Sequence, residues 1–264
     1  MRRLLSSRTM SPFWSAAVLV AALNHSPAHP STSAPAHQSA PAPAQPSAVP
    51  NPFARLLPNL GKDLKSLPSV DTIVIMTVGG LGTIGAHNND IKVNDWAKKQ
   101  PKDPGLAQFG NVAGDAYVQG ALAVTTWWAG KHANNARLET VGSDLIRAQI
   151  LNGVLTVPIK LIVDRTRPNG GSHSFPSGHT SATFATAAVI QRDYGVAASV
   201  PFYALGGIVG WSRVRTSHHW LSDGVFGAAI GITSGLAVTK GRTGNWSVVP
   251  VKTKGGAALY VVRH

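Results

Sequence analysis

The sequence predicts an all-α fold, a helical bundle of about six core helices followed by a C-terminal β-hairpin. Hydrophobic residues make up 44% of the 264-residue chain, which is enough to form a sizeable core. Beyond residue 51 the apolar segments are about 15 to 30 residues long, and strands seldom exceed ten. Glycine, proline and asparagine separate these segments, as they do at helix ends. The predicted core helices are residues 69–86, 111–130, 133–163, 178–194, 195–211 and 217–239.

Two segments precede the predicted bundle. Residues 1–25 combine early arginines with the apolar run FWSAAVLVAAL, an order typical of a secretory signal peptide, and an uncleaved membrane anchor is the alternative. Residues 26–50 consist mainly of alanine, proline and serine, which bury too little apolar surface to fold. We expect these residues to form an extended linker. The folded domain is therefore expected over residues 51–264.

The tail and the third helix contain two smaller structural signals. Residues 248–253 and 259–262 are rich in β-branched side chains and flank a Gly-Gly pair, which predicts the terminal β-hairpin. Asp144 and Arg147 stand three residues apart in the long third helix, so they could form a buried ion pair.

The environment of the bundle has two possible assignments. Uncharged runs such as 72–86, 195–211 and 224–238 contain about 15 to 17 residues, fewer than the roughly 20 that span a bilayer upright. They are also rich in small residues. The composition therefore favours an exported, water-soluble bundle in the periplasm or cell envelope. The alternative is an integral inner-membrane protein with a site that faces the periplasm.

Charge and cysteine content restrict the function. The formal net charge of +13 indicates an anionic partner, such as nucleic acid, an anionic membrane surface or an anionic substrate. The basic residues are scattered without a recognition-helix pattern, so we do not expect nucleic acid to be the partner. The chain contains no cysteine, which excludes disulfides, thiolate metal sites and a cysteine nucleophile.

The first chemically informative cluster is KLIVDRTRP, at residues 160–168. Lys160 and Arg167 are seven residues apart, which is about two helical turns, so both cations would point from one helix face that ends before Pro168. The alternative is a solvated basic helix end that suits the helix dipole. Arg165 fits that alternative, and Asp164 would form an ordinary ion pair with Lys160.

The second cluster is SFPSGHTS, at residues 174–181. Ser177 is a good N-cap for a helix that begins at Gly178, and glycine lets a ligand approach the backbone closely. The free amide groups at this helix start would bind an anion. His179 in the first turn would then lie beside that anion. The alternative is a simple turn and cap with an exposed His179.

The third cluster is SRVRTSHHWLSD, at residues 212–223. Ser217 is expected to cap a helix in which His219 and Asp223, four residues apart, share one face. An aspartate that bonds one ring nitrogen fixes the histidine tautomer and leaves the other nitrogen free to attack or to accept a proton. Such pairs also occur by chance. Together with Arg213, however, the three clusters could hold one phosphate-sized oxyanion between two histidines.

These segments resemble the three-part signature of the type 2 phosphatidic acid phosphatase superfamily. The matching patterns are K-x6-R-P at Lys160–Pro168, P-S-G-H at Pro176–His179 and S-R-x5-H-x3-D at Ser212–Asp223. That superfamily also includes bacterial acid phosphatases and vanadium haloperoxidases. The resemblance implies a helical phosphatase domain over residues 51–264 that cleaves phosphomonoesters without a metal or other cofactor. Vanadate could bind there as a phosphate analogue.

The resemblance also implies residue roles. His219 would be the nucleophile that forms a phosphohistidine, Asp223 would orient it, and His179 would be the general acid. The group expected to bind the substrate phosphate comprises Lys160, Arg167, Ser177, Gly178 and Arg213. Three cations around a phosphoryl group supply the charge neutralisation that its transfer mainly requires.

The sequence does not decide the identity of the substrate, and it is compatible with two other reactions. A lipid phosphate or a small soluble ester could be the substrate, and the short loop NGGSHSF at residues 169–175 suggests an open site. A vanadium-dependent haloperoxidase or a lipid phosphotransferase would use the same residues.

Overall fold

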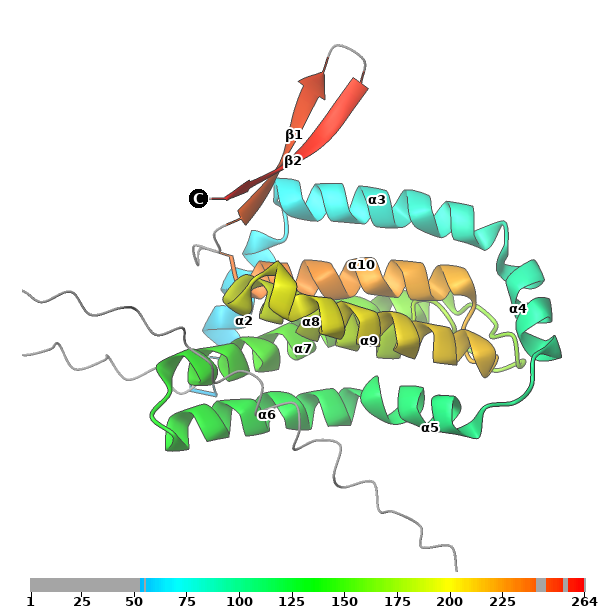
Figure 1. The fold of residues 1–264 in the computed structure, drawn as a ribbon, viewed down its shortest axis with the longest axis horizontal. Coiled ribbons are helices and arrows are strands. Elements are labelled where there is room, and N and C mark those ends of the chain that lie inside the picture. Colours follow the sequence, from blue (N-terminus) through cyan, green and yellow to red (C-terminus); the bar gives the residue numbers. More distant parts are fainter. Residues whose placement is uncertain (1–52, 55, 241–245, 254–255, 264) are drawn as a thin grey trace, which may run out of the picture. The chain divides into compact units, whose positions relative to one another are not determined.

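In the computed structural model the described residues are 53–54, 56–240, 246–253 and 256–263, all within the unit Pro46–His264. The expected signal peptide (1–25) and linker (26–50) lie outside them. The elements are α2 Leu56–Ser66, α3 Val70–His87, α4 Asp90–Lys99, α5 Pro104–Ala113, α6 Ala116–His132, α7 Ala136–Val163, α8 Gly178–Tyr194, α9 Val196–Arg215, α10 Leu221–Val238, β1 Trp246–Thr253 and β2 Gly256–Arg263 (Figure 1).

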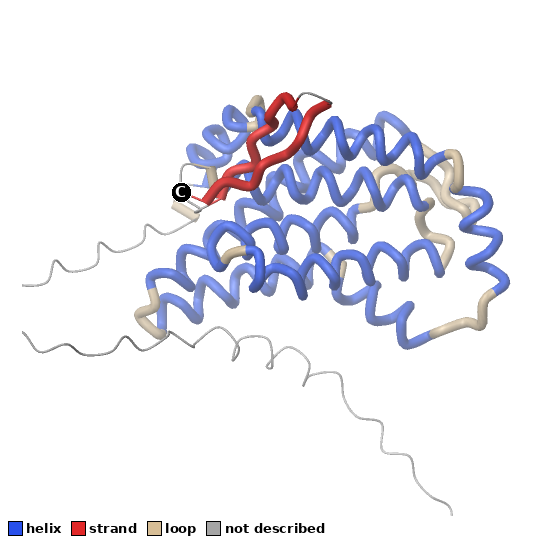
Figure 2. The backbone as a smooth tube through the Cα atoms, turned by 45° about the horizontal axis from the view of Figure 1, so that its top comes forward, coloured by secondary structure: helices blue, strands red, loops and turns tan. Residues whose placement is uncertain are grey.

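The predicted fold class is wrong in two respects. Nine helices, rather than about six, form the described part of the chain, because α2, α4 and α5 have only 10 or 11 residues and are too short to stand out among longer apolar segments. The C-terminal β-hairpin is the second correction, since every element of the bundle between residues 56 and 240 is a helix and no strand takes part in it. The strands drawn red in Figure 2 pair only with each other. An isolated two-stranded hairpin is at best marginally stable in water, so we count no strand in the fold.

Helices α8 and α10 form the centre of the bundle. α8 is buried along most of its length and contacts α7, α9 and α10 (Figure 1). α10 approaches α8 through glycines spaced four residues apart. A Cβ atom at Gly227 would lie 2.6 Å from the Ser177 carbonyl oxygen, and one at Gly231 would lie 2.2 Å from that of Ser181. Glycine is therefore required on this face, because the two backbones touch there. The contact fixes the start of α8 against α10.

The outer surface of the bundle is apolar. Large hydrophobic side chains are exposed along α3, α6, α9 and the last part of α7, with Leu81 66% and Ile162 82% exposed. Three described helices are long and apolar enough to cross a membrane: Val70–His87, Ala136–Val163 and Leu221–Val238. These observations favour the membrane-embedded alternative over the water-soluble bundle that the short uncharged runs predicted. The prediction from uncharged runs failed for α7 because Asp144 and Arg147 interrupt its apolar sequence but bond to each other, 2.6 Å apart, inside the bundle.

Several helix ends meet at one end of the bundle. The end of α7 and the start of α8 lie there, together with the end of α9 and the start of α10. The Ser177 amide donates to the carbonyl oxygen of Asp223 at 3.0 Å, which joins α8 to α10. The Ser222 amide donates to Asp90 Oδ1 at 2.9 Å, which joins α10 to α4. Residues far apart in the sequence thus contribute to one site.

Candidate functional site

Lys160 lies in the last turn of α7 and points back into the loop that precedes α8. Its Nζ donates to the carbonyl oxygens of His173 and Pro176, both at 2.8 Å. The predicted ion pair with Asp164 is not formed, because Asp164 caps α7 in a left-handed conformation (φ 37°) and its carboxylate lies 3.5 Å from His173 Nε2. Lys160 therefore forms no ion pair within the described residues.

Arg167 does not share a helix face with Lys160, contrary to the sequence prediction. α7 ends at Val163, so Arg167 lies in the loop, where its Nε donates to the carbonyl oxygen of Ser172 at 2.9 Å. The two cations are nevertheless close enough to interact electrostatically. In the described part of the chain no carboxylate forms an ion pair with Arg167. The loop, rather than two helical turns, brings this guanidinium to the site.

The start of α8 has the geometry that the sequence predicts. Ser177 is the N-cap, and its hydroxyl accepts from the Thr180 amide at 3.4 Å. No atom lies within 4 Å of the place where a Cβ atom of Gly178 would stand, so the backbone faces open space. His179 follows in the first turn. Its Nε2 is buried without a hydrogen-bond partner among the described residues, and its ring interacts with Arg213 and His219.

Arg213, in the last turn of α9, is almost completely buried. Its Nη1 donates to Asn111 Oδ1 at 2.8 Å, and its buried Nε has no partner within the described ranges. Burying an arginine without a carboxylate is costly unless an anion compensates for it. Arg213 is thus a cation whose remaining hydrogen-bonding capacity is available to a ligand.

His219 and Asp223 lie together, but not in the way predicted. Ser217 has a positive φ of 56° and is not a helix cap; α10 begins at Leu221 with Trp220 as its N-cap. The amide of His219 donates to the carbonyl oxygen of Arg213 at 3.2 Å, so the end of α9 positions this histidine. The distance from His219 Nδ1 to Asp223 Oδ2 is 3.4 Å, which is longer than a normal hydrogen bond.

Burial gives His219 a lowered pKa. Desolvation of its nearly completely buried ring is the largest cause, the charges of Lys160 and Arg167 act in the same direction, and Asp223 opposes them. The ring is therefore neutral at neutral pH. The same interactions show that Lys160, Arg167 and Asp223 surround one histidine.

Sequence reasoning missed two residues of this cluster, Arg165 and Asp90. Arg165 Nη1 donates to Asp223 Oδ1 at 2.7 Å, and Arg165 Nη2 donates to Asp90 Oδ2 at 2.8 Å. Arg165 was assigned to a solvated helix end because its partners lie 58 and 75 residues away. The buried position of Asp90 gives no local signal in the sequence. Only the position of Arg165 within the first motif, two residues before Arg167, could have suggested a role.

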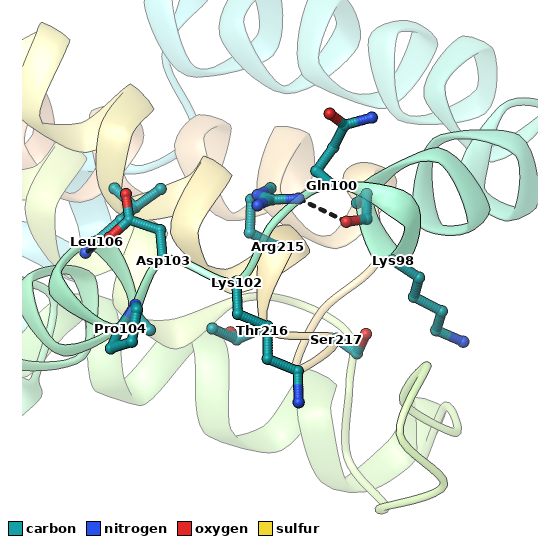
Figure 3. Close-up of a pocket in the computed structure, with 11 residues that line it drawn as sticks. Lys98, Gln100, Lys102, Asp103, Pro104, Leu106, Arg215, Thr216 and Ser217 are labelled. Atoms are coloured by element: carbon teal, nitrogen blue, oxygen red, sulfur yellow. Dashed lines mark hydrogen bonds between the residues drawn. The ribbon is translucent and has the colours of Figure 1, made fainter.

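A pocket of about 410 Å³ shares no lining residue with this cluster, and Figure 3 shows the residues that line it. The end of α4, the start of α5 and residues 215–217 line it. Its wall contains Lys98 and Lys102, while Arg215 donates to the backbone carbonyl oxygens of Ala97 and Pro101. The Thr216 hydroxyl lies 2.9 Å from His218 Nδ1, so the pocket borders the segment that leads to His219.

At one end of the helical bundle, three cations that form no ion pair among the described residues thus lie near two histidines. Comparison with protein families agrees, because residues 169–247 match the model of the PAP2 superfamily. Over those residues the chain is similar to this superfamily. The match contains the second and third motifs, and it begins one residue after Pro168, so the first motif lies just outside it.

Individual relatives cover less of the chain. A lipid A 1-phosphatase of Porphyromonas gingivalis is 36% identical over 97 residues, which is 35% of this chain and 22% of that protein. The chain therefore spans about a fifth of that relative. A transmembrane PAP2-type phosphatidylglycerolphosphate phosphatase of Bacillus subtilis has a similar fold, with a TM-score of 0.50, 18% identity and coverage of 67% of this chain and 94% of that one. Aquifex aeolicus LpxE gives a TM-score of 0.48 at 21% identity, over 57% of this chain and 94% of that one.

Proposed function

We propose that this protein is an integral membrane phosphohydrolase that releases phosphate from a lipid phosphomonoester through a phosphohistidine intermediate. The observation that carries the proposal is the meeting of Lys160, Arg167 and Arg213, none of which has an ion-pair partner among the described residues, beside His179 and His219. A phosphoryl group spreads charge over three oxygens as it is transferred, so three cations are a suitable complement.

The first half-reaction would use both histidines. His219 Nε2 attacks phosphorus while Nδ1 donates to Asp223, so the P–N bond forms as the ester P–O bond breaks. His179 gives its proton to the leaving alkoxide oxygen. The cations and the Gly178 amide stabilise the phosphoryl oxygens, and the Ser177 cap holds that amide in place.

The second half-reaction would reverse these roles. His179, now neutral, takes a proton from water, and the resulting hydroxide attacks phosphorus. The P–N bond breaks, inorganic phosphate leaves and His219 returns to its starting state. No step needs a metal ion or another cofactor, because side chains and one backbone amide meet the developing charge.

A lipid substrate is supported by the surface of the bundle. The apolar exposed faces of α3, α6 and α9 and the three long apolar helices suit a bilayer, in which a lipid phosphate would reach the site laterally. The relative that is 36% identical is named as a phosphatase of a lipid, and the Bacillus subtilis protein is named as transmembrane. A small soluble ester would not require such a surface.

The test is a phosphate-release screen on the full chain in detergent micelles, with and without EDTA, over lipid and soluble phosphomonoesters. We expect release from a lipid phosphate that is insensitive to EDTA and inhibited by vanadate, together with a pellet-bound protein after alkaline carbonate washing. Bromination with vanadate and peroxide, without phosphate release, would instead establish a haloperoxidase. Transfer of the phosphoryl group to an added alcohol in preference to water would establish a phosphotransferase. Removal of the protein from membranes by carbonate would contradict its integral location.

A further inference from the structure

We propose that Arg165 and Asp90 are positioning residues of this site, which together hold the Asp223 carboxylate in the orientation that His219 requires. The inference rests on the proposed function and deepens it. Neither residue occupies a fixed position of the three motifs, and Asp90 lies 132 residues before Ser222, its hydrogen-bond partner on α10.

The contacts of Asp223 divide between its two oxygens. Oδ1 accepts from Arg165 Nη1 at 2.7 Å, while Oδ2 accepts from the Trp220 amide at 2.9 Å and faces His219 Nδ1 at 3.4 Å. The Ser174 hydroxyl also donates to Oδ2. Arg165 therefore holds the oxygen that points away from the histidine, which leaves the other oxygen directed at it. The carboxylate is fully buried, so water does not compete for these positions.

The second arm of Arg165 is fixed in turn by Asp90. Nη2 donates to Asp90 Oδ2 at 2.8 Å, and Asp90 also accepts from the amide and hydroxyl of Ser222 at 2.9 and 2.6 Å. Arg165 Nη1 donates to the same hydroxyl at 2.7 Å. A guanidinium is a rigid planar fork, so two carboxylates and one hydroxyl determine its plane. Through this fork the start of α4 sets the position of a side chain on α10.

The charges separate Arg165 from the cations that face the substrate. Arg165 lies between two buried carboxylates and is neutralised by them, whereas Lys160, Arg167 and Arg213 form no ion pair in the described part of the chain. Arg165 is consequently unsuited to bind phosphate. Its loss should lower kcat, because the His219–Asp223 pair is disturbed, and should leave KM nearly unchanged.

Two variants and a matched control test this inference. Arg165→Lys keeps the charge but loses the fork, and the double variant Asp90→Asn/Arg165→Met removes the bridge without leaving a lone charge at residue 90. The control is Asp63→Asn/Arg147→Met. Arg147 bridges Asp63 and Asp144, each at 2.6 Å, in a second buried cluster at the other end of α10. All full-length proteins are compared in one detergent on the same lipid phosphate, with thermal unfolding measured in parallel.

We expect kcat to fall about 10²-fold in the Arg165 double variant, as misplacement of a catalytic group by about 1 Å would cause, with KM within roughly threefold of wild type. Arg165→Lys should recover part of kcat. The control should unfold at a similarly lowered temperature while its kcat stays within about twofold. A shared loss of kcat in both double variants would mean that Arg165 acts only through stability. A raised KM with unchanged kcat would mean that it contacts the phosphate. Each result would overturn the inference and leave the proposed function standing, whereas a wild-type protein that releases no phosphate would overturn both.

Discussion

The two ends of α10 are held by the same kind of interaction with different consequences. At each end a partly or largely buried arginine bridges two buried aspartates and bonds to α10. Arg165 donates to the Ser222 hydroxyl in the first turn, and Arg147 donates to the carbonyl oxygen of Val238, the last residue, at 2.8 Å. The bridged aspartates are Asp90 and Asp223 at the first end and Asp63 and Asp144 at the other.

What distinguishes the two clusters is the neighbour of the second aspartate. Asp223 lies beside His219, whereas Asp144 pairs with Arg147 on its own helix. An ion pair that costs desolvation energy and contributes little net stability can still fix one geometry. The comparison therefore teaches that burial and pairing of an arginine do not identify a functional cluster. A functional cluster is identified by the side chain that the paired aspartate orients, which is His219 at the first end of α10.

The largest effect on phosphate release should come from substitution of His219, the histidine that contacts Asp223 of the first cluster. His219→Ala removes the proposed nucleophile, and we expect phosphate release to fall by at least about 10⁴-fold. The control is His132→Ala, an exposed histidine at the end of α6. Turnover by the His219 variant within tenfold of wild type would break the distinction between the two ends of α10.

The second cluster should matter for stability alone. Arg147→Ala leaves the carboxylates of Asp63 and Asp144 buried without their arginine, and breaking such a buried pair costs about 3–5 kcal/mol. We expect a lower free energy of unfolding in detergent and an unchanged kcat for each folded molecule, with folded fraction determined by gel filtration. If kcat per folded molecule falls as well, the second cluster also supports the site.

Arg213 differs from Arg165 and Arg147, because it is a buried arginine with no ion-pair partner in the described residues. Arg213→Ala should cost about 2.7 kcal/mol of transition-state stabilisation, as loss of one oxyanion donor does. Steady-state kinetics should show a lower kcat/KM. The control is Arg137→Ala, at the start of α7, which should show none of this loss. Wild-type kinetics for the Arg213 variant would refute its role as a phosphate ligand.

Gly178 and Gly227 lie on the two sides of the contact between α8 and α10. The position of a Gly178 Cβ is open, so Gly178→Ala should fold normally and raise KM about tenfold, less than loss of a full oxyanion donor costs. A Cβ at Gly227 would lie 2.6 Å from the Ser177 carbonyl oxygen, so Gly227→Ala should lower the unfolding temperature as well. Equal unfolding temperatures for the two variants would contradict this difference.

The smallest effect concerns pH. His219 must be neutral to attack, and burial, with the charges of Lys160 and Arg167, lowers its pKa against the opposing effect of Asp223. At pH values between that lowered pKa and about 6.5, an ordinary histidine would be protonated but His219 would be neutral. We therefore expect kcat/KM to fall on the acid side only below about pH 6.5. The profile needs correction for the second ionisation of the phosphate ester near pH 6. An acid limb above pH 6.5 would contradict the assignment.

Some features of the site could be predicted because their signals are local. The Ser177 cap and the start of α8 at Gly178 follow from the preferences of residues at helix ends, and the structure has both. The ion pair of Asp144 and Arg147 was left open by the sequence, whose three-residue spacing only permits it, and the structure forms it. The three motifs likewise predicted which residues would gather, since they carry most of the charged and backbone-bending groups between residues 160 and 223.

Other predictions failed because long-range contacts decide the geometry. Arg167 was expected on α7, but the helix ends at Val163 and Asp164 caps it. The loop that follows lies against the end of α7, where Lys160 donates to its carbonyl oxygens. Ser217 was expected to cap α10, but the end of α9 fixes that turn through the Arg213 carbonyl oxygen. The apolar outer surface also depends on which helices are central, which no single segment reveals.

The amino-acid sequence alone predicts that the chain forms long apolar helices and carries a set of residues suited to one oxyanion. Local rules of helix capping, residue spacing and charge suffice for those features. The packing of the helices adds three features: Arg165 and Asp90 contact Asp223 and its neighbour Ser222, three cations form no ion pair among the described residues, and an arginine binds each end of α10. These depend on contacts between residues 58 to 132 positions apart, which form when helices pack and leave no pattern in the sequence itself.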